Sequence, residues 1–307
     1  MARFTACPLC GSSHLGPLFL AGSQPVERCA ACTLAFLNPQ PEAEDAVLYA
    51  EAYYRGACAV KAGGQENVLE PARIARRLES CRGIVDELEG WLGGRGRWLD
   101  LGCGPGFLLK AARDAGWETA GADVSPFATR YARETFGIAD VRTGPLEALE
   151  FPRAGFDVVS LQHVIEHFRD PGRMVERIRA WLRPRGLLWI ETPDVDSAPA
   201  RRAGPRWEHV KVPEHLFYFG ERTLRRLLGA RGFEVLACRR EVEGTGLLTA
   251  ACGGAEGARR FYEVAKRNAL FRLALAAVRR ANELYRGRLR GASDVIRVVA
   301  RAREGAG

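Results

Sequence analysis

Three glycines at alternate positions, Gly102, Gly104 and Gly106, follow an apolar segment that leads through Asp100. The apolar segment is typical of a buried strand, and a helix is predicted over residues 106–115. A turn without side chains lets a ligand approach the main chain, and the N–H groups at the start of the helix favour negative charge. The sequence therefore predicts a ligand with a negatively charged end at the carboxyl edge of a parallel sheet.

Short strands and amphipathic helices alternate from Arg97 onward, which is typical of an α/β fold with a parallel sheet. We expect seven strands in a Rossmann-like sheet, the last two forming a hairpin, near residues 97–101, 118–123, 139–142, 156–161, 186–191, 233–239 and 246–252. Further helices are expected at residues 126–136, 172–182 and 221–231.

The length of 307 residues allows one sizeable core with small appendages. We divide the chain into a cysteine-bearing module (1–40), a helical connector (41–95), a ligand-binding α/β domain (96–254) and a basic helical tail (255–307). The tail carries 13 Arg/Lys and 5 Asp/Glu, whereas the preceding 254 residues carry 32 of each sign. Any electrostatic argument for an acidic partner therefore depends on the tail alone.

The tail itself has apolar or small positions from Phe261 to Val278, spaced by threes and fours. This spacing predicts an amphipathic helix with arginines on its other face, through which the chain could form a homodimer. A last helical segment is predicted near residues 293–303.

Four of the nine cysteines form two close pairs, Cys7-x2-Cys10 and Cys29-x2-Cys32, separated by 18 residues. This spacing favours a zinc ribbon with four thiolate ligands, a closed and therefore structural site. The chain lacks an apolar run long enough to span a membrane, and its first residues lack a signal-peptide pattern. We therefore expect a cytoplasmic protein without membrane insertion.

The glycine spacing separates two classes of nucleotide-binding turn. Nicotinamide-binding folds use Gly-x-Gly-x-x-Gly, but Phe107 stands where the third glycine is needed. The run from Asp100 to Gly106, Asp-Leu-Gly-Cys-Gly-Pro-Gly, instead resembles motif I of the class I S-adenosylmethionine (SAM) methyltransferases. The resemblance covers residues 95–240 and includes Phe-Asp-Val-Val from Phe156, His-Val-Ile-Glu-His from His163 and Leu-Arg-Pro-Arg-Gly ending at residue 186.

The resemblance implies that SAM is the cofactor and that its methionine end lies against Asp100 and the turn residues Gly102, Cys103, Gly104 and Gly106. Asp123, 21 residues after Gly102, ends the second strand and is expected with Val124 at the ribose. Capping of the next helix is the alternative role for Asp123, and Ser125 fits that role equally well. Leu146 is expected at the adenine, and Gln162 or His163 at the sulfonium.

Methyl transfer to oxygen or carbon needs a group that removes a proton, most often a histidine. Besides His14 in the cysteine module, the chain has His163, His167, His209 and His215. Glu214-His215 precedes an aromatic run, and a similar pair in the sugar C-methyltransferases is associated with proton abstraction. Anchoring of its loop is the alternative role of His215. For Glu166-His167 we favour a structural role at a helix start over a catalytic one.

A zinc module before a SAM fold resembles bacterial small-molecule methyltransferases, notably those that C-methylate nucleotide-linked sugars. The resemblance implies a small-molecule acceptor and places Tyr49, Tyr53 and Tyr54 over cofactor and substrate. Those enzymes usually have a second large C-terminal domain, which is missing here. Carbon, oxygen and nitrogen acceptors therefore all remain open.

Two alternatives to a small-molecule enzyme are considered. An RNA methyltransferase with a zinc module is disfavoured because residues 160–163, Ser-Leu-Gln-His, lack the Asn/Asp-Pro-Pro-Tyr/Phe pattern of base-amino methylation, and no basic-aromatic interleaving occurs. A SAM-fold assembly protein without catalysis is disfavoured by the candidate bases.

Overall fold

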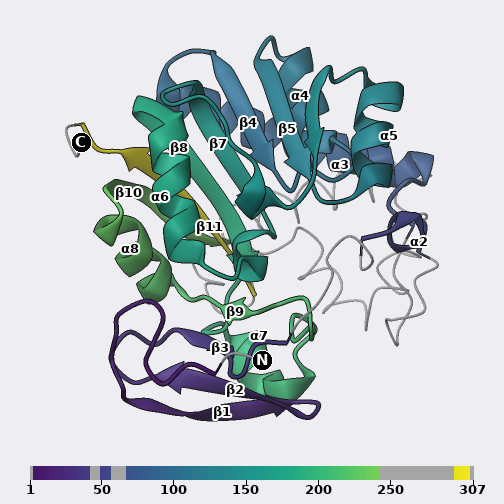
Figure 1. The fold of residues 1–307 in the computed structure, drawn as a ribbon. Coiled ribbons are helices and arrows are strands. Elements are labelled where there is room, and N and C mark those ends of the chain that lie inside the picture. The colour runs from purple at the N-terminus through teal and green to yellow at the C-terminus, as the bar shows by residue number, and fades with distance from the viewer. Residues whose placement is uncertain (1–2, 42–48, 57–66, 242–293, 305–307) are drawn as a thin grey trace, which may run out of the picture.

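The computed structural model describes residues 3–41, 49–56, 67–241 and 294–304 (Figure 1). The strand predicted over 246–252 and the amphipathic helix predicted from Phe261 to Val278 lie outside the described residues.

A seven-stranded sheet forms the centre of the larger part of the molecule, in the order β10-β11-β8-β7-β4-β5-β6. Its strands are β4 (Arg97–Leu101), β5 (Glu118–Asp123), β6 (Asp140–Thr143), β7 (Phe156–Gln162), β8 (Leu182–Pro193), β10 (Phe233–Glu241) and β11 (Val295–Ala302). The five strands from β4 to β8 pair in parallel, and β11 pairs antiparallel with both β8 and β10. The Rossmann-like α/β prediction is therefore confirmed.

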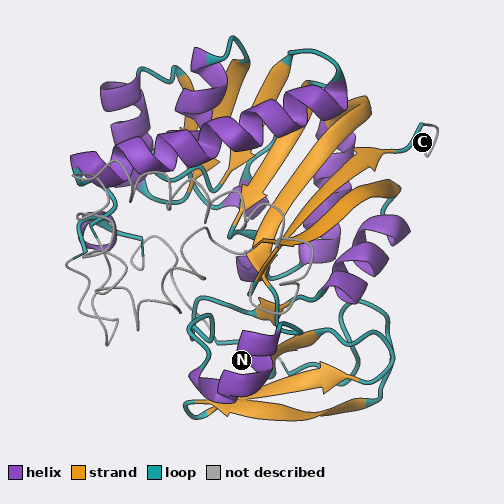
Figure 2. Cartoon of the chain, turned by 180° about the vertical axis from the view of Figure 1, so that it is seen from behind, coloured by secondary structure: helices purple, strands orange, loops and turns teal. Residues whose placement is uncertain are grey.

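Helices cover both faces of this sheet (Figures 1 and 2). On one face lie α3 (Pro71–Leu92), α4 (Phe107–Asp114) and α5 (Pro126–Phe136). On the other lie α6 (Pro171–Trp181) and α8 (Glu221–Ala230). The strands are apolar on both faces because both are covered, with Leu99 and Val159 fully buried on one side and Trp98 and Val158 on the other.

The cysteine module forms a second, four-stranded sheet, in the order β1-β2-β3-β9. The first three strands are consecutive: β1 (Leu15–Ala21), β2 (Gln24–Cys29) and β3 (Ala35–Leu37). The fourth, β9 (Phe217–Tyr218), comes from the segment between β8 and α8. The N–H of Leu37 also donates to the carbonyl of Leu216 (2.9 Å), so this module is joined by main-chain hydrogen bonds to the rest of the chain.

The helical segment predicted near residues 293–303 is wrong, because the structure has the strand β11 there. Val295, Ile296, Val298 and Val299 are all buried between two neighbouring strands. Branched side chains fit such a doubly covered strand better than a helix. The sheet therefore receives its seventh strand from the end of the chain.

The remaining elements are short: α2 (Glu51–Tyr54), α7 (Ala198–Ala203), and the 3-10 turns η1 (Leu146–Ala148), η2 (Ile165–His167) and η3 (Gly204–Arg206). Among the described helices, none is long and apolar enough to cross a membrane.

Candidate functional site

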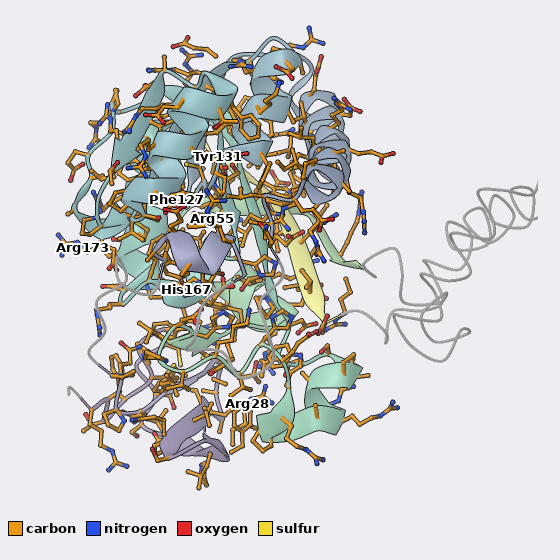
Figure 3. The ribbon with its side chains drawn as sticks, turned by 90° about the vertical axis from the view of Figure 1, so that its right-hand side faces the viewer. Arg28, Arg55, Phe127, Tyr131, His167 and Arg173 are labelled. Atoms are coloured by element: carbon orange, nitrogen blue, oxygen red, sulfur yellow. The ribbon has the colours of Figure 1, made fainter. Side chains whose placement is uncertain are left out.

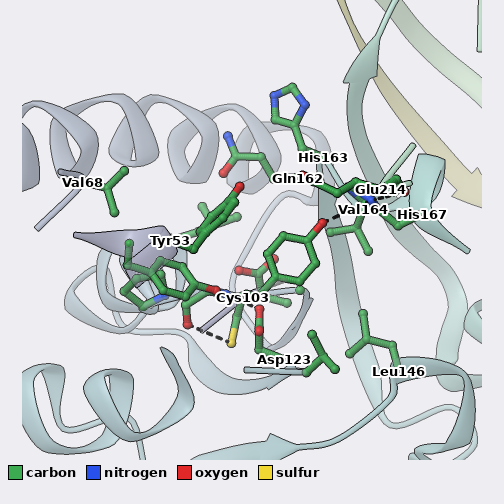
Figure 4. Close-up of a pocket in the computed structure, with 18 of the residues that line it drawn as sticks. Tyr53, Val68, Cys103, Asp123, Leu146, Gln162, His163, Val164, His167 and Glu214 are labelled. Atoms are coloured by element: carbon green, nitrogen blue, oxygen red, sulfur yellow. Dashed lines mark hydrogen bonds between the residues drawn. The ribbon is translucent and has the colours of Figure 1, made fainter. Parts of the chain in front are cut away.

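A cavity of about 400 Å³ lies at the carboxyl ends of β4, β5 and β7 (Figure 4). It has two ends of different chemistry. The glycine-turn end contains Asp100, residues 102–105 and Asp123, and the histidine end contains His163, His167, His209 and His215. All predicted cofactor residues line the cavity except Gly106, and all three predicted catalytic residues, His215, Glu214 and His167, line it too.

The turn between β4 and α4 depends on glycine for two reasons. Gly102, Gly104 and Gly106 have φ values of +67°, +52° and +87°, which side chains rarely adopt. A Cβ on Gly102 would also lie 2.4 Å from Val164, and one on Gly106 would lie 2.9 Å from Ala132. Gly106 therefore serves the packing of the turn against α5 rather than the cavity wall.

The main-chain donors of this turn are largely used within the protein. The N–H groups of Gly102 and Cys103 donate to the carbonyl of Ala122 at 2.7 and 3.0 Å, and that of Gly104 donates to the Asp123 carboxylate at 2.8 Å. Helix geometry leaves the N–H groups of the first turn of α4 without intrahelical partners. An anionic ligand group would therefore meet the start of α4 rather than the glycines.

Asp123 links the end of β5 to the glycine turn. One carboxylate oxygen accepts the N–H of Gly104 and the other accepts the N–H of Ser125, both at 2.8 Å. Ser125, not Asp123, caps α5, since its hydroxyl accepts from Ala128. Burial raises the pKa of Asp123 above its ordinary value. The carboxylate thus stands at the cavity with acceptor capacity left on each oxygen.

Asp100 is buried beside the same turn and is held by a short hydrogen-bond chain. The Ser160 hydroxyl donates to its carboxylate at 2.5 Å, and the indole N–H of Trp98 donates to that hydroxyl at 2.8 Å. Burial raises the pKa of Asp100 to about 7, against the hydrogen bond from Ser160 and with a contribution from Asp123. This carboxyl therefore changes charge near neutral pH. The sequence did not identify Ser160 as its partner.

Three tyrosines connect the two ends of the cavity. Tyr54 stacks on Phe127 of α5 with 5.7 Å between ring centroids, and Figure 3 shows α2 beside this ring. The main-chain carbonyl of Tyr49 accepts from the Ser125 hydroxyl at 2.5 Å, and its phenol lies 3.4 Å from Nδ1 of His167. Tyr53 packs between Tyr49 and Tyr54 (Figure 4).

At the histidine end, four imidazoles lie in sequence along one wall. Ring centroids are 6.1 Å apart for His163 and His209, 6.4 Å for His209 and His215, and 4.8 Å for His215 and His167. Two come from the segment after β7 and two from the segment before β9. The sequence predicted the loops but not that these rings would meet.

His163 is a cationic group of this wall. Its two ring nitrogens lie 3.5 Å from Glu166 and Glu191, and its backbone has a φ of +54°. Burial alone would lower the pKa of His163, but these two carboxylates raise it to about 9. Glu191 is itself held by the amide of Gln162 (2.8 Å) and by Arg297 of β11. At neutral pH, His163 is therefore protonated and cannot serve as a base.

His215 has the opposite character. It is 3% exposed, and burial together with the neighbouring His167 lowers its pKa well below the ordinary value. Nδ1 of His167 lies 2.8 Å from the main-chain carbonyl of Glu214, which only accepts hydrogen bonds, so this nitrogen carries a proton. Two imidazoles able to accept a proton or a cation thus lie next to one that is already charged.

His209 occupies the middle of the wall and also depends on the end of the chain. Its Nε2 lies 3.4 Å from the carboxylate of Asp294, which also accepts from the indole of Trp207 at 3.2 Å. The imidazole of His209, followed by burial and this indole, sets the pKa of Asp294 at about 2. Asp294, Arg297 and Glu191 were not singled out from the sequence, because nothing near them in the chain marks their role.

The four predicted metal ligands are brought together away from the cavity. The sulfur of Cys7 lies 3.5 Å from that of Cys32, and the sulfur of Cys10 lies 3.6 Å from that of Cys29. All four sulfurs lie within 4.8 Å of one another, and none is in a disulfide. Tetrahedral zinc–thiolate geometry places sulfurs about 3.8 Å apart, so the donor set fits such an ion.

Comparison with known proteins agrees with this geometry. A family model described as a methyltransferase domain matches residues 73–237. A ubiquinone biosynthesis O-methyltransferase from Bordetella avium is 34% identical over 113 residues, which cover 35% of this chain and 46% of that protein. A probable S-adenosylmethionine-dependent methyltransferase from Mycolicibacterium smegmatis is 31% identical over 159 residues, covering 51% and 60%. The chain thus spans about half the length of the curated relatives it matches.

Two solved structures share the fold. The 1,6-didemethyltoxoflavin-N1-methyltransferase of Burkholderia thailandensis, with bound 1,6-didemethyltoxoflavin and S-adenosylhomocysteine, superposes with a TM-score of 0.51 at 17% identity and covers 94% of this chain and 99% of that one. A SAM-dependent methyltransferase from Archaeoglobus fulgidus gives a TM-score of 0.50 at 18% identity, covering 73% and 94%. With its family match extending over more than half of its length, the chain belongs to the methyltransferase-domain family of SAM-dependent enzymes.

Proposed function

We propose that this chain transfers a methyl group from SAM to carbon or oxygen of a small-molecule acceptor. The observation that carries the proposal is the cavity itself. It joins a glycine turn and two buried carboxyl groups at one end to a neutral, buried His215 at the other. Related proteins are named as methyltransferases of a ubiquinone precursor and of a heteroaromatic compound, which supports a small acceptor.

At the glycine-turn end, the proposed contacts follow the charges of the cofactor. Asp100 would attract the ammonium group, and the start of α4 would face the carboxylate. Asp123 would accept hydrogen bonds from the ribose hydroxyls, and Leu146 would lie against the adenine. Gln162 and His163 line the cavity between its two ends and would face the sulfonium. Bound SAM supplies an electrophilic methyl group there.

At the histidine end, the chain's own residues would position the acceptor and receive its proton. His215 is neutral at pH 7 and has an unpartnered ring nitrogen, so it can accept a proton. His167 lies beside it, oriented by the carbonyl of Glu214. The cationic His163 would stabilise negative charge that develops on the acceptor. In-line displacement depends mainly on positioning, which the tyrosines and this wall would provide.

We further propose that Cys7, Cys10, Cys29 and Cys32 hold a structural zinc ion. The distances between their sulfurs support this, and four thiolates leave no open position for chemistry. Unpaired thiols are typical of a reducing compartment, which supports action in the cytoplasm. A homodimer formed through residues 255–307 remains part of the proposal.

Binding and transfer can be tested separately. Calorimetric titration with SAM, NAD and a short RNA is expected to give one-to-one binding of SAM alone. Tight NAD binding without SAM binding would contradict the proposal, and RNA binding would favour the RNA methyltransferase. A screen of nucleotide sugars and small phenols, with mass detection of one added CH2, would then identify the acceptor.

A further inference from the structure

Three side chains at the histidine end form a cluster with the composition of a metal site. One carboxylate oxygen of Glu166 and one ring nitrogen each of His167 and His215 lie within 4.8 Å of one another. Glu166 and His215 are 1% and 3% exposed. The two histidines line the cavity, whereas Glu166 lies behind them. The cluster is therefore reached from the cavity and not from the outer surface.

Two polar atoms of this cluster are left without hydrogen bonds. Among the described residues, Oε1 of Glu166 and Nδ1 of His215 are buried and have no hydrogen-bond partner. The nearest charged group, Nδ1 of His163, is 3.5 Å from Oε1, longer than a normal hydrogen bond. Leaving such a group unsatisfied costs about 1–3 kcal/mol, and more for a charged one. A ligand that satisfies both atoms at once would remove this penalty.

The surrounding residues orient the cluster as the second layer of a metal site does. The Thr192 hydroxyl donates to Oε2 of Glu166 at 2.9 Å, which leaves Oε1 as the free oxygen. The carbonyl of Glu214 accepts from Nδ1 of His167 at 2.8 Å, which leaves the other ring nitrogen as a lone pair. Histidine ligands of metals commonly donate their second N–H to a carbonyl or carboxylate in this way.

We propose that Glu166, His167 and His215 bind one divalent transition-metal ion in the wall of the cavity. Two imidazoles and one carboxylate suit an ion such as Mn²⁺, Fe²⁺, Co²⁺ or Zn²⁺, and three ligands leave positions open toward the cavity. This set differs from the four thiolates, which form a closed site elsewhere in the molecule.

The consequence for the acceptor rests on the proposed function. An ion at this place would bind an oxygen of the acceptor and lower the pKa of a hydroxyl there. The acceptor class would then be a molecule that carries a hydroxyl or carbonyl next to the methylated atom. Metal binding itself can be measured without any acceptor.

The test is a titration of the full chain, loaded with zinc at the cysteine site, with Mn²⁺ followed by the electron paramagnetic resonance of the free ion. Mn²⁺ is chosen because thiolates favour softer ions. We expect one Mn²⁺ per chain. Glu166→Gln should weaken binding by more than about tenfold, and Thr192→Val, which removes only the supporting hydrogen bond, by about tenfold.

Glu191→Gln is the matched control, because Glu191 is similarly buried and faces the same His163 but is outside the cluster. It should change Mn²⁺ binding by less than about threefold. Where Glu166→Gln lowers the melting temperature strongly, Thr192→Val and His215→Asn decide the outcome. Absence of Mn²⁺ binding, or equal loss in Glu191→Gln, would overturn the inference. SAM titration of the same samples shows separately whether the proposed function holds.

Discussion

The two ends of the cavity are built from the chain in different ways. The glycine-turn end uses residues 100–107 and 123–125, two short segments on adjacent parallel strands. The histidine end is assembled from residues 163–167, residues 207–215, Glu191 and the start of β11. The first is a local motif that many sequences of this family could carry. The second depends on long-range packing and therefore carries what is individual to this chain.

This difference predicts that the two ends can be disturbed separately. Changes at the glycine-turn end should alter binding of SAM, and changes at the histidine end should alter turnover. The link between them consists of the tyrosines and of residues 162–164, which line the middle of the cavity.

The largest effect is expected for His215→Asn. Loss of the neutral imidazole should lower turnover about 10²- to 10⁴-fold, because a positioned proton acceptor contributes that much. The dissociation constant of SAM should stay within about threefold. Steady-state rates and calorimetry measure the two quantities, with His14→Asn, an exposed histidine of the cysteine module, as the control. Normal turnover on the true acceptor would remove His215 from the mechanism.

Asp123→Ala should act at the other end and weaken SAM binding by about 10- to 100-fold. Hydrogen bonds to a charged group contribute about 1.5–3 kcal/mol, and the substitution also removes the acceptor of the Gly104 N–H. Calorimetry provides the measurement. Asp140→Ala removes a partly exposed carboxylate of β6 and should leave affinity unchanged. Equal losses in both variants would mean that the effect is not specific to the cavity.

A smaller effect is expected from pH. The pKa of Asp100 is about 7, so this carboxyl is neutral in acid and ionised above neutrality. An ammonium group lowers the pKa of a neighbouring carboxylate, and by linkage the affinity for SAM must then fall as pH drops below 7. We expect about a tenfold loss between pH 7.5 and about pH 5.5. Asp100→Asn should give a flat profile, and a wild-type profile that is already flat would contradict the assignment.

The smallest effect on SAM binding is expected when zinc is removed from the cysteine module. Because β3 pairs with β9, loosening residues 34–37 should also loosen residues 215–219, next to His215. Hydrogen exchange should therefore rise in both segments, while the dissociation constant of SAM changes by less than about twofold. Exchange confined to the first 41 residues would show that the module and the histidine end are independent.

The sequence predicted the elements whose signals are local. The glycine turn, Asp123 at the end of β5 and the helix over residues 126–136 follow from neighbouring residues, and the structure has them there. The strand β11 was mistaken for a helix, since Arg297 and Arg301 are four residues apart and its partner strands are far away in the chain. The charge of His163 could not be foreseen either, because Glu191 and Arg297 reach it from β8 and β11.

The central claim is that the glycine-turn end binds the cofactor and the histidine end faces the acceptor. Hydrogen exchange with and without S-adenosylhomocysteine tests it most directly, since the ligand needs no acceptor. We predict slower exchange in residues 101–108 and 122–125, with little change in residues 214–219. Slower exchange confined to residues 207–219, with residues 101–108 unchanged, would contradict the claim.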